Sequence, residues 1–445
     1  MAAFPPVGTE PSRDSAVRAR VQAGLAAIDT EMVEFLRDIV RIPTENPPGR
    51  NYEACAAFAR RRLEDLGYQV AYHAVPADQL DVLAPHGQGL PRVNVVAVLP
   101  GLAARPILHF NGHYDVVPAG NGWSVDPFGG EVRDGRMYGR GVSDMKGGIA
   151  AQVYAIEALR RAGFVLNGTV EHSLVPDEES TGNRNAGMGF LVEQGIIQAG
   201  RTDYVVITEP LEVDNICLGH RGTIQGAFET VGRAAHGAMP ERGVNAIEKM
   251  ALALAAIERD LKPKLRERRS RLRVIPESAA GSSITIGTIV GGTSTNTVAA
   301  HCRAAFDRRL AESETVAGAR AELLAIFDQF AASDPDFQYQ YHEWYATDPV
   351  WVGEQTRTGA AFAAAIRAVL GREPGIVCSP GTDDQRFVVL GAGLRECIIY
   401  GPGEIRQTHV ADESLALADL RHAAEVMALA TLDLLGFEDG RRSPD

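Results

Sequence analysis

Long apolar runs, closely spaced cysteines and an excess of basic residues are all missing from this sequence of 445 residues. No segment approaches the roughly 18 apolar residues that a transmembrane helix needs. Lys and Arg number 44 against 57 Asp and Glu, and the net charge of -13 argues against a surface for nucleic acid or anionic membranes. The five cysteines are scattered without a CxxC pair, which favours reduced thiols and a cytoplasmic location. The N-terminus has prolines and early acidic residues where a signal peptide needs an apolar run.

What is present is an ordinary globular composition, with a length that allows two or three domains at about 150 residues each. Short apolar, β-branched runs alternate with amphipathic helical segments, which is typical of an α/β domain with a mostly parallel sheet flanked by helices. A first helix is predicted to start at Thr30 as N-cap and to end before Pro43, and a second to cover 52–66. The expected strands are Val93–Leu99, Ile107–Phe110, Thr169–Val175, Tyr204–Ile207 and Cys397–Tyr400.

The segment 214–347 follows another pattern, β-α-β-β-α-β, which is the order of a ferredoxin-like α+β unit. Its elements are expected at 216–231, 245–261, 283–290, 298–310, 316–330 and 337–345. Because loop tips tolerate insertions, we predict that 214–347 is a second domain inserted into a first domain made of 1–213 and 348–445.

Histidines and carboxylates follow the carboxyl ends of the predicted strands, and one more carboxylate opens a helix from a glycine-rich loop. In open α/β sheets, ligands bind outside these strand ends. A mixed set of imidazoles and carboxylates suits zinc, cobalt or manganese. Five ligands exceed the need of one catalytic tetrahedral site but suit two metals that share a bridging carboxylate. The candidate ligands are His113, Asp144, Glu179, Glu209 and His409.

Each motif taken alone also has an ordinary interpretation, such as a surface histidine or a solvated acidic loop. A dinucleotide loop is disfavoured because Asp144 stands where the third glycine of GxGxxG belongs. No GxxxxGK[ST] or GxSxG motif occurs, and Ala346 stands where HExxH needs its second histidine. In the acidic run at 177–179, a cation would offset the repulsion, with one glutamate as ligand and its neighbour as base. Asp115 could hold the second ring nitrogen of His113.

Taken together, these motifs resemble the acetylornithine deacetylase and succinyl-diaminopimelate desuccinylase family of dinuclear zinc amidohydrolases and peptidases, which includes aminoacylases and glutamate carboxypeptidase. The matching stretches run nearly end to end, at 43–49, 112–118, 123, 126–128, 139–148, 177–179, 208–210, 232–247, 401–403 and 409. The resemblance implies His113, Asp144 and Glu209 on one metal and Asp144, Glu179 and His409 on the other. It implies Glu178 as the general base, Asp115 as the residue that orients His113, and a cis peptide bond between Asp144 and Met145.

The resemblance also implies roles for residues of the inserted lid domain and of a later loop. His236 would reach the site of a neighbouring subunit in a homodimer and stabilise the oxyanion. Asn296 and Arg309, with Gly381 and Thr382, would bind a carboxylate of a small-molecule substrate, although the adjacent Arg308 could be mistaken for Arg309. No nucleic acid and no membrane is expected as a partner.

The expected reaction is hydrolysis of the amide bond of an N-acyl amino acid by a water that bridges two divalent metal ions, zinc or else cobalt or manganese. Glu178 would take the proton of that water and pass it to the leaving amine. A dipeptidase or carboxypeptidase would use the same site. Hydrolysis of another C–N bond and a catalytically dead binding protein on the same fold are further alternatives. The presence of every ligand and of the base disfavours the last of these.

Overall fold

The apolar runs predicted as strands form one mixed sheet in the computed structural model, which describes residues 14–180 and 182–440. Every residue of β3 (Ile107–His113) and β7 (Thr169–Val175) is buried, so elements cover both faces of these strands. β7, β3, β8 (Tyr204–Ile207) and β17 (Cys397–Ile399) are neighbours in this order and run parallel. Flanking pairings are antiparallel, made by β1 (Gln69–Ala74), β2 (Val93–Leu99) and β9 (Asn215–His220). The predicted α/β class with a mostly parallel central sheet is confirmed.

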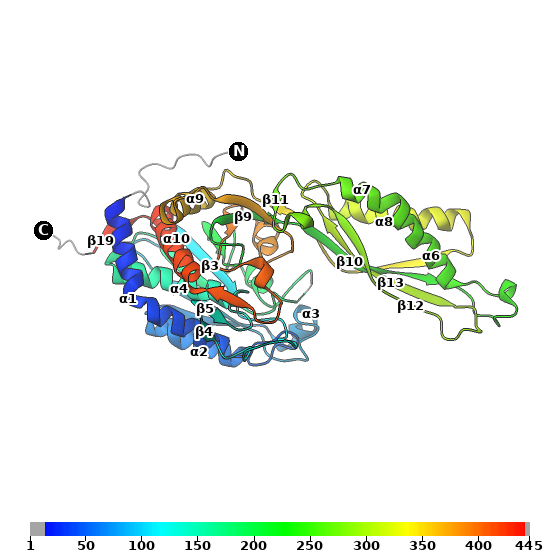
Figure 1. Ribbon diagram of the computed structural model, residues 1–445, viewed down its shortest axis with the longest axis horizontal. Helices are drawn as coiled ribbons and strands as arrows, with labels where there is room; N and C mark the ends of the chain where they lie inside the picture. The colour runs from blue at the N-terminus through cyan, green and yellow to red at the C-terminus, as the bar shows by residue number, and fades with distance from the viewer. Residues whose placement is uncertain (1–13, 181, 441–445) are drawn as a thin grey trace. The chain divides into compact units, whose positions relative to one another are not determined.

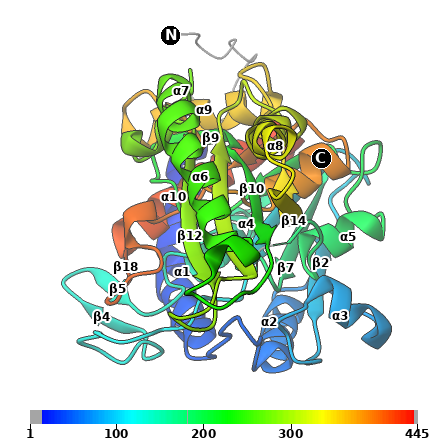
Figure 2. The same ribbon diagram turned by 90° about the vertical axis from the view of Figure 1, so that its right-hand side faces the viewer.

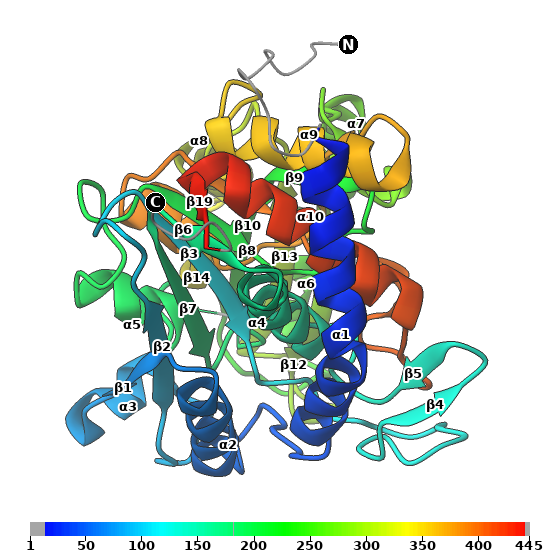
Figure 3. The ribbon, with the colours of Figure 1, turned by 90° about the vertical axis from the view of Figure 1, so that its left-hand side faces the viewer.

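Helices pack on this sheet and on one another (Figure 3). α4 (Lys146–Arg161) contacts β3 and β7 and is itself covered by α1 (Ser15–Val40) and α10 (Leu417–Leu435). α9 (Arg357–Leu370) packs on α10, and α2 (Tyr52–Asp65) packs on β1 and β2. None of the helices in the described part of the chain is both long and apolar enough to cross a membrane.

The first helix starts well before the predicted position. The side chain of Asp14 accepts a hydrogen bond from the Ala16 amide at 2.8 Å and caps a helix of 26 residues. Thr30, predicted as the N-cap, lies inside this helix. The prediction was wrong because the buried stripe of apolar residues continues upstream of Thr30, through Val21, Leu25 and Ile28.

Shorter elements complete this part of the chain. β4 and β5 form a hairpin that β18 joins, and β6 pairs with β19. Their bounds, with those of the remaining short elements, are α3 (Leu80–Leu83), β4 (Glu131–Arg133), β5 (Arg136–Tyr138), β6 (Phe164–Leu166), α5 (Met188–Glu193), β16 (Gly375–Ser379), β18 (Ser414–Ala416) and β19 (Phe437–Asp439).

A second, antiparallel sheet has the strand order β12-β13-β10-β14 (Figures 1 and 2). α6 and α8 pack on it, and the stacked rings of Phe228 and Phe327 lie in the core between sheet and helices, with centroids 3.7 Å apart. The β-α-β-β-α-β order matches the ferredoxin-like pattern read from the sequence. The elements of this order are β10 (Gly222–Val231), α6 (Ala246–Ala256), β12 (Ser283–Gly291), β13 (His301–Leu310), α8 (Val316–Ser333) and β14 (Gln338–Thr347). The same stretch of chain also forms α7 (Lys262–Glu267), β11 (Arg273–Val274) and β15 (Val350–Trp351), and these two strands are not part of the four-stranded sheet.

The chain divides into two units, one built around each sheet. Unit 2 comprises His220–Trp351 and Cys378–Thr382, and unit 1 comprises the other described residues. Unit 2 thus begins at 220, whereas the sequence analysis predicts the domain boundary at 214. The strand-rich run expected at 216–231 is two strands, because β9 ends at His220 and β10 starts at Gly222.

Candidate dinuclear metal centre

The candidate ligands of unit 1 lie at the carboxyl ends of neighbouring parallel strands. His113 is the last residue of β3, the acidic turn 177–179 follows β7, and Glu209 follows β8. β3 pairs in parallel with both β7 and β8, so the carboxyl ends of these three strands lie side by side. Asp144 precedes α4, which packs on β3, and His409 follows β17. The buried, apolar strands fix the main chain on which each polar side chain stands.

The carboxylate of Asp144 lies between the two histidines. Its Oδ1 is 3.2 Å from Nε2 of His113, and its Oδ2 is 3.3 Å from Nε2 of His409. The Asp144–Met145 peptide bond is cis, as the resemblance implies. One carboxylate that faces a different imidazole with each oxygen is placed as a bridging ligand requires.

The three glutamates complete the cluster around these histidines. Glu179 Oε2 is 3.1 Å from Nε2 of His409, and Glu209 Oε1 is 3.5 Å from Nε2 of His113. Glu178 Oε2 is 4.0 Å from the same His113 nitrogen. Two groups of donor atoms lie close enough to hold a cation, one of His113, Asp144 and Glu179 and the other of His113, Glu178 and Glu209. The predicted base therefore stands among the predicted ligands.

Asp115 supports the site in a different way from the one expected. Nδ1 of His113 lies 2.9 Å from the main-chain carbonyl oxygen of Asp115 and 3.5 Å from its carboxylate Oδ1, so the closer partner is the main chain. The buried carboxylate accepts the amide N–H groups of Glu178 at 3.3 Å and Glu179 at 3.2 Å. It also accepts the side chain of Asn46 at 2.9 Å. Asp115 thus holds both the imidazole and the acidic turn.

Asp177 is a supporting residue that sequence reasoning missed. It is fully buried with a φ of 62°, in the left-handed region, and its carboxylate accepts Arg92 Nε at 2.6 Å and the Tyr52 hydroxyl at 3.1 Å. The guanidinium of Arg92 also lies over the ring of Tyr52, 4.9 Å from its centroid. Asp177 therefore takes its counterion from Arg92, which leaves Glu178 and Glu179 for the cluster. The only sequence signal was an isolated arginine just before a strand.

A known protein family matches most of this chain. Residues 109–433, which include every candidate ligand, match a family model described as peptidase family M20/M25/M40. The chain belongs to this family. The resemblance stated from the motifs is thereby confirmed, and membership makes the chain a metal-binding hydrolase of amide C–N bonds.

Several curated M20 relatives are named succinyl-diaminopimelate desuccinylase. The protein from Gluconacetobacter diazotrophicus is 29% identical over 93% of this chain and 99% of its own length. The protein from Methylobacterium radiotolerans is 32% identical, covering 74% and 82% of the two chains, and that from Cupriavidus necator 30% identical, covering 81% and 88%.

Solved M20 structures share the fold. Human carnosine dipeptidase 1 aligns with a TM-score of 0.73 and 19% identity over 94% of this chain and 99% of its own. A Bacillus subtilis protein, described as a dinuclear metal binding peptidase from the M20 family, aligns with a TM-score of 0.65 and 17% identity over 92% and 99%.

The electrostatics of the M20 site fit divalent cations. Burial raises the pKa of Glu209 well above its usual range, and the nearby carboxylates of Asp144 and Glu178 raise it further. Burial also raises the pKa of Glu179, and hydrogen bonds with Asp144 and Glu179 raise the pKa of His409 to about 10. Without a cation, protons must therefore offset the repulsion between these carboxylates. The oxygen and imidazole donors are those that zinc, cobalt and manganese accept, so the residues fit such ions.

The remaining predicted site residues all belong to unit 2. The Gly237 amide donates to the main-chain oxygen of Asn296 at 2.7 Å, which places the exposed His236 next to the exposed Asn296. Arg309 lies on β13, half-buried, and donates to Asp307 at 2.7 Å. The hydroxyl group of Tyr345 donates a hydrogen bond to Oγ1 of Thr382 at 2.8 Å, and Gly381 is adjacent in the chain. The adjacent Arg308, unlike the half-buried Arg309, is fully buried and forms an ion pair with Glu314.

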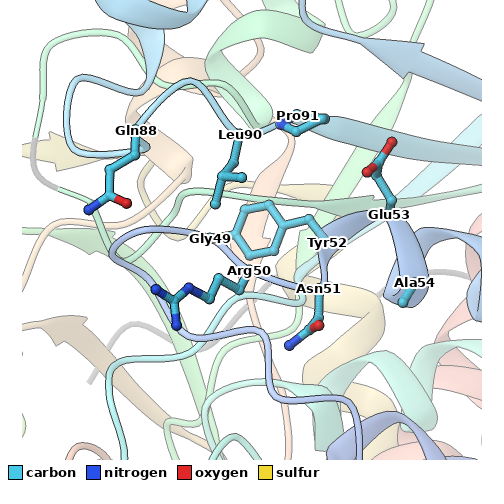
Figure 4. Close-up of a pocket in the computed structure, with 9 residues that line it drawn as sticks. All are labelled: Gly49, Arg50, Asn51, Tyr52, Glu53, Ala54, Gln88, Leu90 and Pro91. Carbon is cyan, nitrogen blue, oxygen red and sulfur yellow. The ribbon is translucent and has the colours of Figure 1, made fainter.

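A cavity of about 670 Å³ is lined in part by Tyr52 (Figure 4). The hydroxyl group of Tyr52 donates to Asp177 in the acidic turn. Arg92, which holds Asp177, also donates to the carbonyl oxygen of Leu90 in the cavity wall at 3.0 Å. The candidate metal ligands are not among the lining residues, which are Gly49, Arg50, Asn51, Tyr52, Glu53, Ala54, Gln88, Leu90 and Pro91.

Proposed function

We propose that this M20 hydrolase is a dinuclear, metal-dependent deacylase that releases the amine from an N-acyl amino acid. The observation that carries the proposal is the Asp144 carboxylate between two histidines, with Glu178 beside them. The naming of curated relatives as succinyl-diaminopimelate desuccinylases supports an acyl group on an amino acid as the substrate class.

Two divalent cations per subunit are proposed, zinc in the first place and cobalt or manganese as alternatives. His113, Asp144 and Glu209 would hold one, and Asp144, Glu179 and His409 would hold the other. When bound, the ions supply Lewis-acid polarisation of the scissile carbonyl and lower the pKa of a water in the site.

Glu178 is the proposed general base. Its side chain is 13% exposed, and Asp115 fixes its main chain by accepting its amide N–H. Burial raises the pKa of Glu178 well above its usual range, and the nearby Asp384 adds to this. A carboxylate of raised pKa can take the proton of the attacking water and then deliver it to the leaving nitrogen as the C–N bond breaks. The products are a carboxylate and a protonated amine, which together account for both protons of the water.

We further propose that 214–347 is a lid and dimerisation domain of a homodimer, inserted between 1–213 and 348–445. His236 of one subunit would donate a hydrogen bond to the oxyanion in the site of its partner. Asn296 and Arg309, with Gly381 and Thr382, would bind the substrate carboxylate. The exposed side chains of His236 and Asn296, which lie next to each other, support a shared role.

A reducing compartment, the cytoplasm, is the proposed location. The five cysteines are buried thiols, which such a compartment preserves.

The test is a turnover screen of the metal-free protein reconstituted with zinc, cobalt or manganese. It should cover N-succinyl, N-acetyl and N-carbamoyl amino acids and a set of dipeptides. We expect the highest kcat/KM on an N-acyl amino acid, and the Glu178→Gln protein, purified in the same way, controls for contaminating hydrolases. Preference for dipeptides would replace the deacylase by the dipeptidase or carboxypeptidase alternative. No turnover on any of these amides, with two metals bound, would refute both.

A further inference from the structure

The buried carboxylate of Glu413 accepts hydrogen bonds from the loop that carries Asp144. Its side chain is completely buried. Its Oε1 accepts main-chain N–H groups of Gly141 at 3.0 Å, Ser143 at 2.9 Å and Asp144 at 3.1 Å. Its Oε2 accepts Nη1 of Arg140 at 2.6 Å. All of these donors come from one short stretch of the chain.

The loop is wrapped around this carboxylate as amide nests wrap around bound anions. Gly141 has a φ of 84°, and a Cβ at this position would lie 2.5 Å from Cγ1 of Val116, so the tight turn needs glycine. The main-chain oxygen of Glu413 also accepts the Gly139 amide at 3.0 Å. A hydrogen bond with an ionised partner, here the Arg140 guanidinium, is roughly twice as strong as a neutral one, so Glu413 anchors the loop.

Glu413 stands only four residues after the candidate ligand His409. The turn between them is constrained, because His409 and Asp412 both have positive φ values, 62° and 55°, and Asp412 accepts the Ser124 amide at 2.8 Å. One end of this short segment therefore carries an imidazole of the site, and the other end holds the main chain of Asp144. His409 Nε2 and Asp144 Oδ2 are 3.3 Å apart.

We propose that Glu413 is a positioning residue that fixes the spacing between Asp144 and His409 and thereby sets the affinity of one of two cation positions. That position is the one assigned to Asp144, Glu179 and His409, a proposal that rests on the two-metal function above. The other position also takes Asp144, but its remaining ligands, His113 and Glu209, stand at strand ends that none of the hydrogen bonds of Glu413 reaches. Glu413 is not a ligand itself, since its two oxygens already accept four hydrogen bonds.

A purely structural role makes a different prediction. Removing the carboxylate leaves Arg140 buried without its partner, which destabilises a protein wherever it occurs. Glu171 provides a matched control in the same unit, because it is also a buried carboxylate paired with an arginine, Arg201, at 2.9 Å, and with His109 at 3.0 Å. Glu171→Gln repeats the chemical change away from the Asp144 loop.

The experiment compares wild type, Glu413→Gln, Glu413→Ala and Glu171→Gln by equilibrium dialysis against buffered free Zn²⁺, with bound metal measured by mass spectrometry. Thermal unfolding of the metal-free proteins is measured in parallel. We expect Glu413→Gln to bind the first Zn²⁺ as wild type does and the second about 10- to 100-fold more weakly, the usual cost of losing an outer support of a metal ligand. Glu413→Ala should lose more, and Glu171→Gln should bind both ions normally.

Each outcome decides one question. If Glu413→Gln is folded and binds both ions like wild type, or weakens both equally, the positioning role is refuted. If Glu171→Gln weakens the second ion to the same degree, the effect is general destabilisation and the role is refuted as well. If Glu413→Ala does not fold, the glutamine variant alone decides. Binding of fewer than two Zn²⁺ by wild type would instead refute the two-metal function.

Discussion

His172 should make the folded protein sensitive to acid. This residue of β7 is fully buried, with its Nε2 3.1 Å from the Tyr68 hydroxyl and its ring stacked on Phe110 at a centroid distance of 5.6 Å. Burial, together with the nearby His109, lowers its pKa from 6.5 to about 3. The folded state therefore keeps His172 neutral at a pH where the unfolded chain takes up a proton. Stability from this group is complete above pH 6.5 and is lost as the pH falls toward 3.

The size of the effect follows from the pKa difference. Each pH unit below the unfolded pKa costs about 1.4 kcal/mol, so His172 alone should remove about 2 kcal/mol of unfolding free energy between pH 7 and pH 5. His172→Gln keeps an acceptor for Tyr68 but cannot titrate. Urea unfolding followed by circular dichroism at both pH values, with a chelator present, measures the loss. We expect it to be about 2 kcal/mol smaller in His172→Gln than in wild type.

A control separates this effect from the other histidines. His86 has an exposed side chain, and His86→Gln should leave the difference between pH 7 and pH 5 as it is in wild type. If His172→Gln loses as much stability on acidification as wild type does, the buried imidazole is not the source of the sensitivity, and the reasoning is wrong.

Three further predictions concern the site and unit 2. Glu178→Gln should keep its metal content but lose about 10²- to 10⁴-fold in kcat, and a wild-type kcat with metal bound would remove Glu178 from the mechanism. Arg308→Ala should cost about 1.5–3 kcal/mol of stability because it removes a buried, charge-assisted hydrogen bond to Glu314, which keeps Arg268 as a second partner. Arg309→Ala should instead raise KM with little loss of melting temperature, and the reverse pattern would show that the two arginines were assigned wrongly. Co-refolded His236→Ala and Glu178→Ala proteins should regain activity as mixed dimers, and verified heterodimers without activity would contradict a shared site.

The periodicity of the sequence was sufficient to place the central strands and most of the cluster. Short, largely β-branched runs of four to seven residues favour buried strands, although polar residues interrupt the apolar ones in β3 and β7, and the side chains that follow them emerge at one end of the sheet. For this reason His113, Glu179 and Glu209 could be brought together before any coordinates were known. His409, which follows the run Cys397–Tyr400, joined them on the same ground, and Asp144 needed the glycine-rich loop as a further signal.

The supports of the site could not be predicted in this way. Asp177 and Arg92 meet only because β2 and β7 are neighbours, and they are 85 positions apart in the chain. Glu413 and Arg140 are separated by 273 positions. Neither pair leaves a periodic pattern, because a single buried charge is compatible with any local structure and its partner is chosen by the fold. The break between β9 and β10 lies inside the strand-rich run 216–231, where only Arg221 separates the two strands.

The division of residues between the two units has an evolutionary consequence. All the candidate metal ligands lie in unit 1, where buried strands fix them, while His236, Asn296 and Arg309 lie in unit 2. Substitutions at the latter positions leave the packing under the metal donors untouched. Under the roles proposed above, selection for a new substrate would act on unit 2 and selection for retention of the metals on unit 1. Under these roles, lineages could diversify in what they hydrolyse without passing through an intermediate that has lost its metals.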